Sequence, residues 1–117
     1  MSKGDLGHKL ASAYEITLSV KGRTSGKDIS RPVWFSYGGS TLSLLPVQGS
    51  DTNWYKNLQA NSSLKISADG IETPARGKLI KDNNRVNEIV GKFKSKYGEG
   101  DVKKYYTKFD VAVEVEL

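Results

Sequence analysis

A short turn flanked by two glycines holds the residues best suited to bind an anion. The turn reads Gly22-Arg23-Thr24-Ser25-Gly26-Lys27-Asp28. Its glycines expose backbone N–H groups, and its two hydroxyls and two cations add donors suited to phosphate or carboxylate. A P-loop is excluded, because three residues rather than four separate the glycines and Asp28 follows Lys27. The turn therefore predicts an anion nest, with a plain polar hairpin loop as the alternative.

The next segment brings a cation and two aromatic rings close to the turn. Its residues are Arg31-Pro32-Val33-Trp34-Phe35. From the start of a strand, Arg31 could point into the same anion site. Neighbouring side chains of a strand face opposite sides, so we expect one of Trp34 and Phe35 in the core and the other on a pocket or surface. Simple packing of both rings is the alternative.

A predicted helical segment carries one unusual polar residue, Asn57. Helical spacing places Asn57 on the same face as Trp54 and Leu58. An amide between two large apolar side chains either makes a cap or packing hydrogen bond or recognises the polar edge of a ligand. The sequence leaves both interpretations open.

The composition removes several classes of catalytic site. The 117 residues include no cysteine and a single histidine, His8. Thiolate nucleophiles, cysteine-ligated clusters and multi-histidine metal sites are therefore excluded, and we expect no metal. The acidic residues form no pair at a spacing useful for acid–base catalysis. If the chain is an enzyme, it takes its chemistry from a bound cofactor.

The net charge of +5 is unevenly distributed along the chain. Residues 21–31 hold four cations and one acid, whereas residues 81–108 hold eight cations and four acids. We expect the first group to bind an anionic ligand and the second to be solvated helix surface, which argues against nucleic acid as a partner. No stretch approaches the roughly 18 apolar residues of a membrane span. The lack of cysteine fits a reducing cytoplasm, which is the predicted location.

Hydrophobic periodicity predicts the elements that must position these residues. The predicted strands cover residues 14–21, 29–37, 41–47, 64–68, 71–80 and 109–117; a short helix runs through residue 61, a longer one lies between Asp82 and Gly98, and residues 101–107 are candidates for another helical turn. Consecutive strands joined by tight turns favour a mostly antiparallel sheet that closes, or nearly closes, into a barrel. We predict one mainly β, α+β domain over residues 1–117, with residues 1–13 as a mobile or short helical extension.

Three motifs together resemble a known family. They are the glycine turn, the segment 31–35 and the run Trp54-Tyr55-Lys56-Asn57-Leu58-Gln59-Ala60-Asn61. They resemble the deazaflavin (F420)-dependent nitroreductase family of the flavin-binding split-barrel superfamily. The resemblance implies a six-stranded antiparallel split β-barrel of the FMN-binding type, with one short and one longer helix. Such proteins are usually homodimers and bind F420 or FMN.

The resemblance also implies a role for each matching residue. By position, the cofactor phosphate would contact Arg23, Thr24, Ser25, Gly26 and Lys27; its ring system would lie along Pro32, Val33 and Trp34; and its other edge would meet Val47, Gln48, Gly49, Ser50, Trp54 and Asn57. Ile29 stands where the family has an arginine, which Arg31 could replace, and Gln48 stands where it has a lysine. F420, FMN and other anionic ligands therefore all stay open.

The implied function is hydride transfer between bound F420 or FMN and a small electron-poor acceptor such as a quinone, a nitro compound or an enone. The alternative is a split-barrel protein that binds a cofactor or a phosphorylated ligand without catalysis. We expect a homodimer whose other partners are the cofactor and the acceptor.

Overall fold

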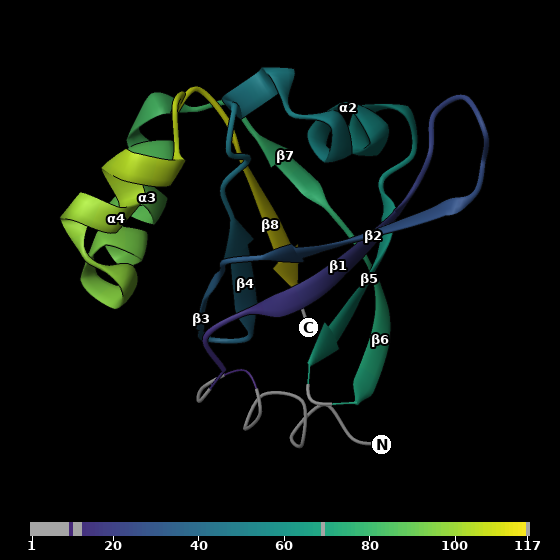
Figure 1. Ribbon diagram of the computed structural model, residues 1–117, viewed down its shortest axis with the longest axis horizontal. Helices are drawn as coiled ribbons and strands as arrows, with labels where there is room; N and C mark the ends of the chain where they lie inside the picture. The colour runs from purple at the N-terminus through teal and green to yellow at the C-terminus, as the bar shows by residue number, and fades with distance from the viewer. Residues whose placement is uncertain (1–9, 11–12, 69, 117) are drawn as a thin grey trace.

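Two four-stranded antiparallel sheets form the body of the protein in the computed structural model, which describes residues 10, 13–68 and 70–116 (Figure 1). The first sheet has the order β2 (Asp28–Val33), β1 (Ile16–Lys21), β5 (Ser63–Ala68) and β6 (Ile71–Arg76). The second has the order β3 (Ser36–Gly38), β4 (Thr41–Leu44), β8 (Ala112–Glu116) and β7 (Lys78–Ile80). The 3-10 turn η1 (Gly49–Asp51) and helices α2 (Asn53–Ala60), α3 (Asn83–Tyr97) and α4 (Glu99–Tyr105) connect them.

The mostly antiparallel α+β architecture is confirmed, but the prediction of a six-stranded barrel with two helices is wrong. Two predicted strands are each divided between the sheets. Segment 29–37 breaks after Val33 into β2 and β3, and segment 71–80 breaks at Gly77 into β6 and β7. Helix α4 occupies the segment considered only for a helical turn. The described residues therefore form eight strands in two sheets.

Gly77 explains why the second of these segments changes sheet. Its N–H donates to the Ser62 carbonyl over 2.9 Å. A Cβ at Gly77 would lie 3.1 Å from Leu64 of the first sheet and 3.1 Å from Val113 of the second. Side chains of both sheets press on this point, so a side chain at residue 77 would require Leu64 and Val113 to shift, which favours glycine where the chain crosses.

Side chains from both sheets meet in one core. The alternation predicted for the first strand is confirmed, because Ile16, Leu18 and Val20 are buried. Val113 and Val115 of β8 enter the same cluster from the second sheet. Burial of each such side chain contributes about 1.5–3 kcal/mol. This core fixes the position of β1 and, through its pairing with β1, the position of β2, which contributes residues to the candidate site.

A second core lies between the second sheet and helix α3. The predicted apolar stripe is buried as expected, at Val86, Ile89, Val90, Phe93 and Tyr97. Asp82 caps the helix by accepting a hydrogen bond from the Arg85 N–H at 3.0 Å, and Gly98 ends it with φ +97°. Helix α4 follows at once and packs beside α3.

The arrangement in Figure 1 places α2 and the β1–β2 turn side by side at one end of the first sheet, while α3 and α4 lie beside the second sheet. None of the described helices is long and apolar enough to cross a membrane. The predicted extension over residues 1–13 lies largely outside the described residues.

Candidate functional site

A cavity of about 810 Å³ is bounded by the β1–β2 turn, the start of α2 and the end of α4. Cavities of this size hold cofactors and drug-sized ligands. The predicted site residues that line it are Arg23, Thr24, Ser25, Arg31, Pro32, Val33, Trp34, Val47, Gln48, Trp54 and Asn57. The remaining predicted residues, which are Gly26, Lys27, Gly49 and Ser50, lie outside this lining.

The β1–β2 turn closes on itself. The Gly22 N–H donates to the Lys27 carbonyl at 2.8 Å, and the Gly26 N–H donates to the Gly22 carbonyl at 2.8 Å. Gly26 has φ +70°, a conformation that glycine adopts without strain. Ser25 Oγ accepts from the Lys27 N–H at 3.2 Å. The backbone N–H groups of Gly22, Gly26 and Lys27 are thus used within the turn, so the prediction that its glycines expose N–H groups to an anion is wrong.

Arg23 lies across the first turns of α2 and is held there by Asn57. Asn57 Oδ1 accepts from the Arg23 backbone N–H at 3.1 Å and from Nη1 at 2.8 Å. Nη1 also donates to the Asn53 carbonyl at 3.4 Å. Asn57 is only 4% exposed. In the part of the chain that the structure describes, no carboxylate pairs with Arg23, so its positive charge remains available to a ligand in the cavity.

The acid of the turn does not neutralise this charge. Asp28 pairs with Lys21 at 2.7 Å and lies 4.0 Å from Lys65. These three residues border a separate hollow on the first sheet. The hydrogen bond from Lys21 keeps the pKa of Asp28 below its usual value. Arg31 lines the cavity, and its Nη1 donates to the Ser30 carbonyl at 3.1 Å.

The start of α2 opens onto the cavity without a side-chain cap. The first helical hydrogen bond runs from the Lys56 N–H to the Thr52 carbonyl at 3.0 Å. A threonine at this position often caps the helix through its hydroxyl. The Thr52 hydroxyl instead accepts from the Gln48 N–H at 2.8 Å. Thr52, Asn53 and Trp54 line the cavity. Free N–H groups at a helix start favour an anion, so this end of α2 adds to the effect of Arg23.

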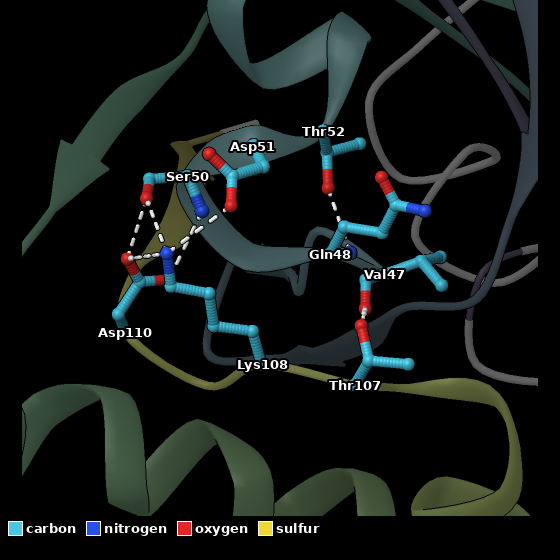
Figure 2. Close-up of polar contacts among 8 residues, drawn as sticks. All are labelled: Val47, Gln48, Ser50, Asp51, Thr52, Thr107, Lys108 and Asp110. Carbon is cyan, nitrogen blue, oxygen red and sulfur yellow. Dashed lines mark hydrogen bonds and ion pairs between the residues drawn. The ribbon is translucent and has the colours of Figure 1, made fainter.

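The loop 47–52 contributes Val47, Gln48 and Thr52 to the cavity lining and is tied to the chain before β8 (Figure 2). The Val47 carbonyl accepts from the Thr107 N–H at 2.9 Å. Asp110 accepts from the Ser50 N–H at 3.0 Å and from its hydroxyl at 2.5 Å. Lys108 Nζ lies 3.3 Å from Asp51. Val47 and Gln48 face the cavity, whereas Ser50 is occupied by these contacts.

Charge and close packing secure this connection. Burial raises the pKa of Asp110, but the hydrogen bonds from Ser50 and from the Asp110 backbone, together with the charge of Lys108, outweigh it and keep that pKa below its usual value. Gly49 has φ +57°, and a Cβ there would overlap Asp110 Oδ1 and lie 2.9 Å from Lys108 Cγ. The loop therefore requires glycine at this position for both conformation and space.

An aromatic wall completes the cavity. The Trp34 ring stacks on Tyr97 with centroids 4.2 Å apart and planes 9° from parallel. The rings of Tyr105 and Trp34 form a T-shaped pair with centroids 5.6 Å apart. Phe35 is fully buried, so Trp34 and Phe35 divide between cavity and core as the strand alternation predicted. The wall offers a flat apolar surface suited to a planar ring.

Several lining residues were not among the predicted cofactor contacts. They are Glu15, Gly22, Ile29, Leu45, Thr52, Asn53, Tyr105 and Tyr106. The sequence does offer one signal for Tyr105 and Tyr106, since two adjacent aromatic residues end a charged segment that could form a helical turn. Nothing local in the sequence, however, places the end of α4 next to Trp34, which follows β2.

The chain is similar to known proteins at the level of family and of fold. Residues 1–117 match the family model described as F420H(2)-dependent quinone reductase. No curated protein sequence matches the chain.

Solved structures share the fold at low sequence identity. The chain is similar to an F420-H2 dependent reductase, FDR-A, with TM-score 0.69 and 16% identity over 88% of this chain and 94% of that chain. A structure described as a domain-swapped dimer gives TM-score 0.69 and 16% identity over 88% and 80%. HutZ, described as a heme storage protein from Vibrio cholerae, gives TM-score 0.72 and 9% identity over 97% and 88%. These structural matches establish the fold alone.

Proposed function

Because the chain belongs to the F420H(2)-dependent quinone reductase family, we propose that it is a deazaflavin-dependent oxidoreductase that uses F420 to reduce a quinone. The family membership expected from the motifs is thereby confirmed. One observation carries the proposal: a single cavity joins a cationic end at Arg23 to an aromatic wall at Trp34. An anionic cofactor with a planar ring needs both features.

The residues present fit such a cofactor. Arg23 and Arg31 line the cavity, and no described carboxylate pairs with either, so both could hold the phosphate. The uncapped start of α2 adds backbone donors at the same end. Pro32, Val33 and Trp34 would lie along the ring system. When bound in its reduced form, F420 supplies the hydride.

The protein's own part is binding, orientation and exclusion of water. The aromatic wall keeps water from one side of the cavity. Reduction of a quinone to a hydroquinone also requires a proton, and ionisable side chains that line the cavity include Glu15, Tyr105 and Tyr106. Burial raises the pKa of Tyr106, so its phenol stays protonated at neutral pH and can donate a hydrogen bond to an acceptor oxygen.

The family match also favours F420 over FMN, and a quinone over a nitro compound or an enone, as the ligands of this chain. We further propose a homodimer. The resemblance implies one, and a protein of the same fold is described as a domain-swapped dimer.

Titration with F420 and with FMN tests the proposal. Trp34 and Trp54 both line the cavity, so a bound cofactor should quench their fluorescence saturably, with F420 binding more tightly than FMN. Mixing the protein with F420H2 and a soluble naphthoquinone should then oxidise F420H2 in a protein-dependent manner. Absence of quenching by F420 would rule the proposal out.

Cofactor binding without catalysis is the second candidate function. One observation favours it: the same fold occurs in a protein described as a heme storage protein. Saturable F420 binding without F420H2 oxidation by quinone, nitro or enone acceptors would select this function over the reductase.

A further inference from the structure

Asn57 contacts the glycine turn through one atom that serves two donors. Its Oδ1 accepts from the Arg23 backbone N–H at 3.1 Å and from the Arg23 guanidinium at 2.8 Å. The side chain is 4% exposed and comes from the buried face of α2. A rigid, buried acceptor on a helix thus fixes an exposed cation on a turn.

We propose that Asn57 is a positioning residue, which acts on the anionic cofactor by holding the Arg23 guanidinium in place; this inference rests on the proposed function. The alternatives expected from the sequence were a packing hydrogen bond and direct recognition of a ligand. Direct recognition through Oδ1 is blocked, because two Arg23 donors already occupy that atom.

The geometry leaves part of the guanidinium for a ligand. The two hydrogen bonds from the Arg23 side chain to α2 both use Nη1, which donates to Asn57 Oδ1 and to the Asn53 carbonyl. Within the described part of the chain, Nε and Nη2 make no hydrogen bond. A guanidinium presents its donors as a planar fork, so fixing one nitrogen also fixes the direction of the other two.

Fixing this side chain before binding should improve affinity. An arginine on an exposed turn samples many rotamers, and a ligand that orders it must overcome that entropy. Asn57 imposes the order within the folded protein itself. The acceptor is neutral, so Arg23 is oriented without loss of its charge. An aspartate at the same position would orient the side chain equally well but cancel the charge.

Four variants separate these effects. Asn57→Leu removes the acceptor, Asn57→Asp keeps an acceptor and adds a negative charge, and Arg23→Ala removes the cation. The double variant of Arg23→Ala with Asn57→Leu tests whether the two residues act together. Asn61→Asp is the matched control, because Asn61 lies at the exposed end of the same helix and accepts from the Ser63 N–H.

Dissociation constants for F420, measured by tryptophan fluorescence, should fall into a clear pattern. Arg23→Ala, Asn57→Leu and Asn57→Asp should each weaken binding by about tenfold to a hundredfold. The double variant should bind about as weakly as Arg23→Ala alone, and Asn61→Asp should bind like the wild type. Losses that multiply in the double variant would overturn the proposal, as would normal binding by Asn57→Asp.

Arginine side-chain NMR gives a second reading that needs no ligand. The Arg23 Nη1 protons should show restricted rotation in the wild type and in Asn57→Asp, and free rotation in Asn57→Leu. Free rotation in the wild type would overturn the proposal. If the wild type does not bind F420, the proposed function fails; the same variants titrated with inorganic pyrophosphate, together with the NMR reading, then decide the role of Asn57.

Discussion

One phenol at the end of α3 determines where Trp34 lies. Tyr97 Oη accepts from the Phe35 N–H at 3.0 Å and donates to the Tyr14 carbonyl at 2.7 Å. Its ring stacks on Trp34. The phenol therefore holds the junction between β2 and β3 from one side while its ring supports the cavity wall. A buried donor of this kind is costly to leave without a partner.

Replacement of Tyr97 by Phe should lower the free energy of unfolding by about 1–3 kcal/mol, because the buried Phe35 N–H loses its acceptor. The stack on Trp34 should survive, so F420 affinity should change little. Urea unfolding measures the first effect and fluorescence titration the second. Tyr105→Phe is the control, since Tyr105 is 50% exposed and its loss of a hydroxyl should leave stability unchanged.

The same variant should alter the alkaline stability of the protein. Burial raises the pKa of Tyr97 to about 12, whereas tyrosine in an unfolded chain titrates at about 10. The folded state holds this proton more tightly than the unfolded chain does. The stabilisation that results is therefore complete below pH 10 and is lost as the pH rises through about 12. Unfolding free energy should fall less steeply over this range in Tyr97→Phe; identical slopes would contradict the assignment.

Among the elements, the loop 47–52 depends most on a single glycine. Gly49 and Gly39 have nearly the same φ, +57° and +58°, but a Cβ at Gly39 would meet nothing within 4 Å. Alanine at either position should therefore pay the cost of positive φ, about 1 kcal/mol. Gly49→Ala should lose more stability than Gly39→Ala, because its Cβ would collide with Asp110. Gly49→Ala should also bind F420 more weakly, since Val47 and Gln48 of the same loop line the cavity. Thermal unfolding and F420 titration measure both; equal destabilisation by the two variants would refute the role of the Asp110 contact.

The elements themselves were largely predictable, because the signals that form them are local. Alternation identified β1 and β8, and the stripe from Val86 to Tyr97 identified α3 with its cap at Asp82. The division of segments 29–37 and 71–80 was not predictable from the same signals. Alternation reports which side of a strand is apolar, but not which of two sheets it joins. At Gly77 that choice depends on Leu64 and Val113, which are distant in sequence.

Much of the cavity lining was predicted as well, through the turn and the helix start that the motifs marked. Tertiary contacts decided the remainder. Tyr105 and Tyr106 reach the cavity only because α4 packs beside α3, and Ser50 is withdrawn because Asp110 binds it from the far end of the chain. The role of Asn57 was open in sequence, since its partner Arg23 lies 34 residues away.

For the molecule as a whole, charge should act in two separable ways. Arg23 lines the cavity, whereas Lys27 is exposed and lies outside the lining. Lys27 should therefore attract an anionic cofactor through its electrostatic field without contacting it.

Lys27→Gln should slow association with F420 by about twofold to threefold at low salt and leave the dissociation rate unchanged. Arg23→Gln should instead speed dissociation at every salt concentration. Stopped-flow tryptophan fluorescence at two ionic strengths measures both rates, with Lys92→Gln on α3 as a variant of equal charge change. Faster dissociation from Lys27→Gln would mean that Lys27 touches the cofactor, as the motif resemblance implies, and that the ligand extends beyond the cavity described above.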